Sequence, residues 1–305
     1  MTRRPMFSTR SDWVVLAWMV FMHVGALAAF FTFSWKALVI CLFLWWLTGG
    51  VGITLGYHRY FTHRSFATPK PVEYLLAIIG CMAGESGPIG WVAAHRYHHT
   101  YSDTDQDPHS PLRGFFWAHM GWLFGREKFL QDDESCKKFT PDMSKDRFLV
   151  WIDKWHILPT FVLAAVLYAM GGWAFIVWGI FLRSVLVYHS TWLVNSAAHV
   201  WGYQSYKWSN DASRNNWWVA LLTFGEGWHN NHHAFQRSAR HGMAWWELDL
   251  TYRLIQVLWV LGLASKIHVP VPASTTGATF PVDFELPRSQ TGAGPIIGRA
   301  ADAAR

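Results

Sequence analysis

The feature that most constrains this chain is a long apolar stretch near its start, which runs from Trp13 to Phe33. His23 is the only ionisable side chain within it. An α-helix rises about 1.5 Å per residue, so a helix of this length crosses a hydrocarbon layer of about 30 Å. We therefore expect an integral membrane protein.

Three more apolar stretches follow, and they predict an all-α fold with four transmembrane helices in two hairpins. These stretches cover residues 37–57, 157–171 and 173–199. Short segments separate the first stretch from the second and the third from the fourth, and the latter break falls at Gly171 and Gly172. Together they form a single membrane domain over residues 1–270. Residues 271–305 are rich in Gly, Ala, Ser, Thr and Pro, and we expect a disordered tail there.

Composition agrees with a membrane protein and excludes some other classes. Only 15% of the residues are charged, against about 25% in ordinary soluble domains, and the chain has 21 Trp, a residue favoured at membrane interfaces. Cys41, Cys81 and Cys136 have no CxxC spacing, which argues against a disulfide framework and a thiolate metal site. The net charge of +6 suits anionic lipid headgroups. No run of Lys and Arg interleaves with aromatics, so we expect no nucleic-acid partner.

The distribution of basic residues predicts how the chain lies in the membrane. Three arginines precede the first stretch, whereas the two short hairpin turns contain only Lys36. By the positive-inside rule both termini lie in the cytoplasm, and residues 58–156 and 200–270 form a helical cytoplasmic cap. Within the cap, Pro71–Ala94 is partly apolar but contains two glutamates, so we expect a buried or interfacial helix rather than a span.

The 16 histidines are clustered, and their spacing is typical of metal ligands. The three clusters read HRYFTH, HRYHH and HNNHH, and they contain His58 and His63; His95, His98 and His99; and His229, His232 and His233. Helix positions i, i+3 and i+4 share a face, as in the zinc motif HExxH. Adjacent histidines point about 100° apart, so we expect His98 and His99 to serve different metals. His58 and His63, five apart, are expected to diverge as well. The pattern predicts two metals that share a ring of imidazoles.

The expected topology places all three clusters on the cytoplasmic side, where they can meet. A fourth contributor fits the same place, because Asn195 and His199 of NSAAH are four apart at the cytoplasmic end of the last stretch. A lone histidine is more often a packing residue. We assign that role to His23, His156, His189, His241 and His268, and leave His109 and His119 open between packing and support of the ligands.

The donor set narrows the choice of metal. Neutral imidazole suits Fe, Zn, Cu and Ni, but a structural zinc is four-coordinate and cannot use nine histidines. A pair of irons accommodates them and leaves positions open for dioxygen, although the chain lacks the Glu and ExxH ligands of ferritin-like di-iron sites. Nearby carboxylates suit orientation of the imidazole rings, and they are Asp103, Asp105, Asp107 and Glu226.

The segments HRYFTH, HRYHHTYSDTDQDPH, NSAAH and GEGWHNNHHAF together resemble the membrane fatty-acid desaturases, in particular their Δ9 (stearoyl-type) branch. The resemblance covers about residues 40–265 and implies that nine histidines bind two irons. The implied ligands are His58, His63, His95, His98, His99, His199, His229, His232 and His233. It also implies that Asn195 contacts one iron through water. No catalytic residue is expected beyond the metal centre and its supports Asp103, Asp107, His109 and Glu226.

The implied reaction uses dioxygen and two electrons to remove hydrogen from adjacent methylenes, leaving a cis double bond. The animal acyl-CoA branch carries an Arg-Asp pair just before its second histidine box, where this chain reads Val92, Ala93 and Ala94. These three residues, together with the segments GWHNNHHAF and SARHG, resemble acyl-lipid Δ9 desaturases of cyanobacteria and plants more closely. Arg126 is near a position that is basic in the acyl-CoA branch, but Glu127 follows it. We therefore expect a lipid-esterified acyl substrate, with acyl-CoA as the alternative.

Electrons are expected to come from a separate ferredoxin or cytochrome b5-like donor, because the segment after Pro270 is too short for a fused cytochrome b5-like module. Two other functions remain open. A hydroxylase on the same scaffold would yield an alcohol instead of an alkene. A metal transporter would need polar ligands in the middle of its spans, where this chain offers only His23 and His189.

Overall fold

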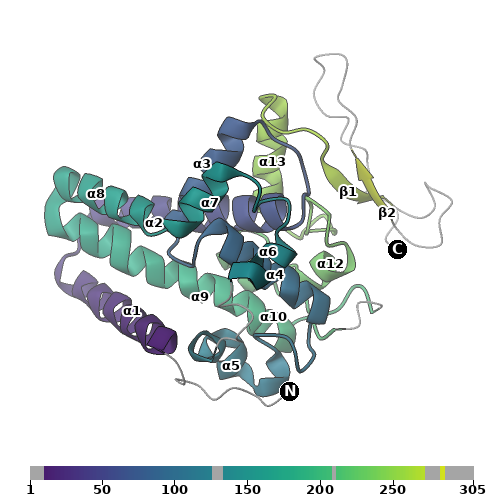
Figure 1. The fold of residues 1–305 in the computed structure, drawn as a ribbon, viewed down its shortest axis with the longest axis horizontal. Helices are drawn as coiled ribbons and strands as arrows, with labels where there is room; N and C mark the ends of the chain where they lie inside the picture. Colours follow the sequence, from purple (N-terminus) through teal and green to yellow (C-terminus); the bar gives the residue numbers. More distant parts are fainter. Residues whose placement is uncertain (1–9, 126–132, 208–210, 272–281, 286–305) are drawn as a thin grey trace.

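The computed structural model describes residues 10–125, 133–207, 211–271 and 282–285, and they form a mostly helical structure (Figure 1). By length and composition, three of the described helical stretches are able to cross a membrane. They are Asp12–Phe31, Trp35–Thr62 and Leu158–Val200. The first two coincide with the first two predicted stretches, and the third contains both of the others. The expectation of a helical protein with long apolar helices is confirmed.

The N-terminal apolar region is built from four consecutive helical elements. They are α1 (Arg10–Leu27), η1 (Ala28–Phe31), α2 (Trp35–Trp45) and η2 (Trp46–Thr62). Ser34 begins α2, because its side chain accepts a hydrogen bond from the backbone N–H of Ala37 at 3.1 Å. η2 is a π-helix, and the backbone N–H of His63 continues its pattern by donating to the carbonyl of His58 at 3.2 Å. The wider turn decides where these two histidines point.

The third apolar stretch reverses direction at the glycine pair in its middle. It contains α8 (Leu158–Ile176), η6 (Val177–Leu182), α9 (Arg183–Asn195) and α10 (Ala197–Val200). Gly171 and Gly172 have non-helical backbone inside α8, and Gly172 has a φ of 63°, which glycine adopts without the steric cost of a Cβ. The chain then runs back along itself, so that a Cβ on Gly179 would lie 2.6 Å from Leu167 Cδ1.

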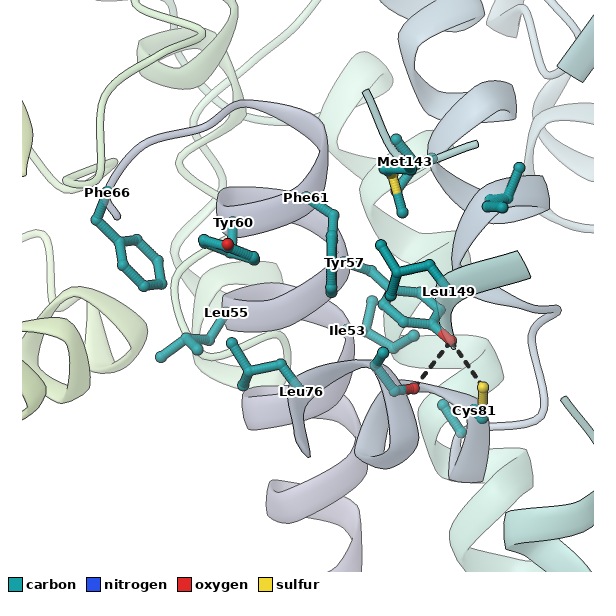
Figure 2. Close-up of a cluster of buried hydrophobic side chains, with 14 of the residues drawn as sticks. Ile53, Leu55, Tyr57, Tyr60, Phe61, Phe66, Leu76, Cys81, Met143 and Leu149 are labelled. Atoms are coloured by element: carbon teal, nitrogen blue, oxygen red, sulfur yellow. Dashed lines mark hydrogen bonds between the residues drawn. The ribbon is translucent and has the colours of Figure 1, made fainter. Parts of the chain in front are cut away.

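Two helices between the apolar stretches, α3 (Lys70–Met82) and α4 (Pro88–Tyr101), carry the predicted buried segment. α3 packs closely on η2, because a Cβ on Gly52 would lie 2.9 Å from Gly80 Cα. Figure 2 shows the core at this contact, where the Tyr57 hydroxyl lies 3.2 Å from Cys81 Sγ. Neither α3 nor α4 belongs to the stretches that are long and apolar enough to span.

α4 is attached to the end of η2 by Arg96. Its guanidinium donates to the carbonyl oxygens of Phe61 at 2.7 Å and Thr62 at 3.2 Å, and to Asp142 at 2.8 Å. Backbone carbonyls at a helix end have no partner within the helix, so the arginine satisfies groups that would otherwise be unpaired. Through this contact the histidines of α4 lie beside those of η2.

The remaining helices are short and surround the histidines. They are η3 (Pro111–Arg113), α5 (Phe115–His119), η4 (Gly121–Phe124), α6 (Asp133–Phe139), α7 (Arg147–Lys154), α11 (Trp217–Leu222), α12 (His229–Ala234) and α13 (Leu250–Val260). Two fully buried asparagines hold α12. Asn231 donates to the carbonyl of His241 at 2.8 Å, and the side-chain oxygen of Asn230 accepts from the backbone of Tyr206 at 2.8 Å. The asparagines of HNNHH therefore fix the short helix that carries its histidines.

Two strands depart from the all-helical expectation. β1 (His268–Val271) pairs antiparallel with β2 (Val282–Glu285). β2 lies within residues 271–305, where we expected a disordered tail. The other residues of that tail, after Val271, lie outside the described residues.

Candidate metal centre

The structure brings all nine expected histidine ligands together, in two adjacent groups. The five-histidine group contains His58, His63, His95, His99 and His232, and the four-histidine group contains His98, His199, His229 and His233. In each group the nitrogens able to bind a metal lie within 4.8 Å of one another. Histidines from η2, α4, α10 and α12, far apart in sequence, contribute to the two groups.

Helix geometry explains how α4 and α12 serve both groups. His95 and His99, four apart on α4, both belong to the five-histidine group, while the neighbouring His98 belongs to the other group. On α12 the division is reversed. His229 and His233, four apart, belong to the four-histidine group, while His232 belongs to the five-histidine group. Adjacent residues on a helix point about 100° apart. His98 and His99 therefore diverge as the sequence predicted.

The expectation that His58 and His63 diverge is wrong. Both belong to the five-histidine group, and their ring centroids are 4.7 Å apart. On an α-helix residues five apart would not share a face. Here the chain forms a π-helix, whose hydrogen bonds join residues five apart, so His63 returns to the face that carries His58. Spacing alone gives no sign of the change in helix type.

The facing imidazole nitrogens lie too close together for both nitrogens of a pair to carry a hydrogen. Nε2 of His58 is 3.2 Å from Nε2 of His232, and Nε2 of His95 is 3.0 Å from Nε2 of His99. In the other group Nε2 of His229 is 3.0 Å from Nε2 of His199. Within each pair at most one nitrogen can carry a hydrogen, so at least one presents a lone pair. Lone pairs converging in two places are what a metal site requires.

The pKa values of the group members also favour metal binding. Burial lowers the pKa of His63, His95, His99 and His232 well below the ordinary value, and the charge of neighbouring imidazoles lowers it further. These imidazoles are therefore neutral at physiological pH. Neutral imidazole is the form that binds iron and zinc. On this ground, the residues fit a metal.

Three carboxylates support the four-histidine group. Each accepts a hydrogen bond from the Nδ1 atom of one histidine: Asp107 from His98 at 3.0 Å, Asp103 from His199 at 3.3 Å, and Asp211 from His233 at 2.6 Å. A hydrogen on Nδ1 leaves the lone pair on Nε2, which is the nitrogen that faces the group. Burial opposes ionisation of Asp107, but the charges of His98 and His109 lower its pKa.

Sequence reasoning identified Asp103 and Asp107 but missed Asp211. Asp211 is 22 residues from His233 in the chain, and no helical spacing connects the two. The sequence shows only that Asp211 is a carboxylate in the segment between α10 and α11, and this does not distinguish it from a surface residue. The two supporting aspartates that were identified stand within a few residues of the histidine cluster on α4.

One carboxylate supports the five-histidine group. Glu226 Oε2 lies 2.7 Å from His58 Nδ1, but the N–H bond of the ring does not point at the oxygen as a hydrogen bond requires. The other oxygen of Glu226 accepts a hydrogen bond from Arg59 Nε at 3.0 Å. Among the described residues, the other four histidines of this group have no carboxylate within ion-pair distance. Arg59 was not identified from the sequence.

The remaining predicted residues lie around the groups without entering them. The ring of His109 is 4.3 Å from that of His98, and its Nδ1 is 3.6 Å from Asp107. Asn195 ends α9 and lines a cavity beside His229. Asp105 is exposed.

That cavity reaches both histidine groups. It has a volume of about 400 Å³, and its walls include His58 and His95 of one group and His229 of the other. Much of the remaining wall is apolar or aromatic, with contributions from α1, η2, α4 and α9. Trp91 lines it, stacks on His95 with ring centroids 5.1 Å apart, and donates to Glu85 at 3.0 Å. Burial raises the pKa of Glu85 to about 7.

Comparisons with known proteins give one family. Residues 33–264 match the family described as fatty acid desaturase. The chain is 51% identical, over 85% of its length and 94% of the relative's, to a "sn-1 stearoyl-lipid 9-desaturase" of Anabaena variabilis. It is 45% identical to a "sn-2 palmitoyl-lipid 9-desaturase" of Nostoc sp. (strain 36), over 88% and 94% of the two chains. It is also 45% identical to an "Acyl-CoA C20 Delta5-desaturase" of Anemone leveillei, over 82% and 79%.

Proposed function

Because the chain belongs to the fatty acid desaturase family, whose members are O2-dependent oxidoreductases, we propose that it introduces a cis Δ9 double bond into an acyl chain esterified to a lipid. The names of the Anabaena and Nostoc relatives support both the lipid carrier and the position of the double bond. The sequence resemblance to this family is confirmed.

The observation that carries the proposal is a cavity that contacts both histidine groups. An acyl chain in it would place one pair of methylenes beside His58, His95 and His229. The aromatic walls exclude water from the reacting carbons and hold one conformer of the chain. Fixed positioning of this kind means that the entropy cost of bringing the reacting groups together is met on binding and not in the reaction step.

We propose two irons as the resident cofactor, one in each histidine group, with Asn195 in contact through water. The family implies iron, and the neutral imidazoles and their carboxylates fit it. Iron would supply the activation of dioxygen that attack on an unactivated C–H bond needs. The residues of the chain hold the ligand nitrogens with their lone pairs directed inwards. Asp103, Asp107 and Asp211 orient three of those rings.

We also propose that the chain crosses the membrane four times, in two hairpins, with both termini and the metal centre on the cytoplasmic side. The reversal at Gly171 and Gly172 supports the second hairpin. Phe30 and Phe31, near the end of the expected first span, are 84% and 89% exposed, and lipid covers such apolar side chains more favourably than water does. The proposed electron donor is a separate ferredoxin or cytochrome b5-like protein.

The lipid carrier is favoured over CoA by the wall of the cavity. Val92 and Ala93 are fully buried and Ala94 lines the cavity, so none of the three offers a charge to a CoA headgroup. Arg126 and Glu127, the other residues relevant to this choice, lie outside the described residues. The acyl-CoA relative of Anemone keeps CoA as the alternative carrier.

Expression in a host that lacks its own desaturase tests the proposal. Fatty-acid analysis with location of the double bond should show a new cis Δ9 product, and separation of lipid classes should show it first on intact lipids. Accumulation first in the acyl-CoA pool would support the alternative carrier. An alcohol in place of an alkene would mean a hydroxylase, and the desaturase proposal would fail.

A further inference from the structure

His241 lies beside the five-histidine group, although the sequence places it among ordinary packing residues. Its side chain is fully buried. Its Nε2 has no hydrogen-bond partner among the described residues. A buried polar nitrogen without a hydrogen bond costs free energy, so its presence here requires a reason.

The backbone around His241 is held rigidly in place. Its N–H donates to Asp249 Oδ2 at 2.7 Å, and Arg59 Nη1 donates to the same carboxylate oxygen at 2.9 Å. Arg59 also donates to the carbonyl of Ala239 at 2.6 Å. The segment between α12 and α13 is therefore attached to the helix that carries His58, and it delivers the ring of His241 to one fixed place.

At that place His241 contacts the carboxylate that supports the five-histidine group and one imidazole of the group itself. Its Nδ1 is 3.0 Å from Glu226 Oε2, the oxygen that lies 2.7 Å from His58 Nδ1. Its ring lies against that of His232, with centroids 4.5 Å apart and planes inclined by 35°. One carboxylate oxygen thus lies between two imidazoles, and one metal-facing imidazole rests on the ring of His241.

We propose that His241 is a positioning residue for the five-histidine group. Its Nδ1 retains Glu226 against His58, and its ring sets the position of His232. The need for such a residue follows from the single carboxylate of this group, whose Oε2 atom lies between His58 and His241. The four-histidine group has three aligned carboxylates and no equivalent requirement. This inference rests on the proposed function only in that the group holds iron.

Three substitutions separate the two ring nitrogens. The amide nitrogen of His241→Asn falls near the position of Nδ1, that of His241→Gln falls near Nε2, and His241→Ala removes both. If Nδ1 acts on Glu226, the Asn variant should keep most of its iron affinity. The Ala and Gln variants should lose about 10–100-fold, the usual effect of removing a group that supports a ligand.

The measurements are iron per chain after challenge with a chelator, and the Mössbauer spectrum of protein loaded with ⁵⁷Fe. We expect the spectrum of the Ala variant to change at one of the two irons and to remain unchanged at the other. His23→Asn is the matched control and should keep both irons. Thermal unfolding of the iron-free variants measures any effect on the fold itself.

Two results would overturn the inference. If His241→Gln retains iron while His241→Asn loses it, the ring acts through Nε2 and not through Glu226. If His241→Ala lowers the iron-free melting temperature but leaves iron retention and the spectrum unchanged, the residue serves only the fold. Failure of the proposed function would look different, because the wild-type protein would then lack iron or form no alkene.

Discussion

The two histidine groups differ in how their imidazoles are supported. The four-histidine group has fewer imidazoles but three carboxylates, each hydrogen-bonded to Nδ1 of a different histidine. The five-histidine group has one carboxylate, Glu226, in close but misaligned contact with His58. Neutral imidazoles carry no charge to offset that of a metal cation, whereas carboxylates beside them do.

The two groups therefore differ in how they would stabilise a bound metal cation. The five-histidine group has one more nitrogen donor, and the four-histidine group has negative charge from its three supporting aspartates. A carboxylate on Nδ1 also raises the basicity of the imidazole. We therefore expect the four-histidine group to hold the more electron-rich iron, and the five-histidine group to depend on a single carboxylate.

The largest effect should come from removing a ligand of the smaller group. His199→Ala leaves three imidazoles there, so desaturation should fall below detection and iron content should drop. Product analysis and iron analysis of the purified protein measure this. The protein should still insert, because the backbone hydrogen bonds of its helices are internal.

His23→Ala is the matched control for His199→Ala. His23 bonds to the carbonyl of Met19 and to His189, away from both groups, so turnover should persist. Near-normal product from the His199 variant together with loss in the His23 variant would refute the ligand assignment.

The second effect concerns the single carboxylate of the larger group. Glu226→Gln removes the charge that His58 and His241 share and weakens a partner of Arg59, which is fully buried. We expect a loss of iron affinity near the upper end of about 10–100-fold, and a loss of about 1.5–3 kcal/mol in the free energy of unfolding. Iron retention and thermal melts should change together. A variant with lower stability but full iron retention would show that Glu226 supports Arg59 alone.

A smaller effect should follow from removing one of three carboxylates. Asp211→Asn keeps a side-chain oxygen that accepts from His233 Nδ1 but loses its charge, and Asp103 and Asp107 remain. Iron affinity should therefore fall by about 10-fold, at the lower end of the usual range. The same chelator challenge measures it, with Asp105→Asn, an exposed change, as the control. A loss as large as that of Glu226→Gln would contradict the view that the aspartates share one role.

The smallest effect on iron binding should come from Glu85, a carboxyl in the cavity wall whose hydrogen bond comes from Trp91 and not from a histidine, so that its substitution acts on stability. Its pKa is raised by burial from 4.5 to about 7. The neutral form therefore favours the folded state at low pH, and this advantage is lost as the pH rises from 4.5 through about 7. The free energy of unfolding should fall by about 3 kcal/mol over this pH range in the wild-type protein, and Glu85→Gln should remove that fall.

Melting temperatures at pH 5 and pH 8 measure the effect of Glu85. The wild-type protein should be less stable at the higher pH by more than the Gln variant is. Asp107 is the control for this range: its pKa is lowered from 3.8, so its ionised form stabilises the native state equally at both pH values, and Asp107→Asn should keep the wild-type difference between them. An equal pH dependence in wild type and Glu85→Gln would mean that Glu85 ionises normally.

Local spacing was sufficient where the helix is regular and failed where it is not. The divergence of His98 and His99 follows from the 100° step of α4 and was predicted. The convergence of His58 and His63 depends on the π-helical turn of η2, which no residue pattern announced. Asp103 and Asp107 were found because they stand next to a histidine cluster. Asp211 was missed because it stands 22 residues from His233. His241 stands near the HNNHH cluster in the chain but was assigned to packing, because no helical spacing connects it with that cluster.

The order of residues along the chain was enough to predict long apolar helices, a break at Gly171 and Gly172, and nine imidazoles in clusters with helical spacing. These properties depend on neighbouring residues, so they can be read along the chain. The division of the imidazoles into a five-histidine and a four-histidine group, and the pairing of each carboxylate with its ring, could be seen only in the tertiary structure. That division depends on contacts such as those of Arg59 with Glu226 and Asp249, which join residues far apart in sequence. Directional hydrogen bonds form only when packing has brought their partners together.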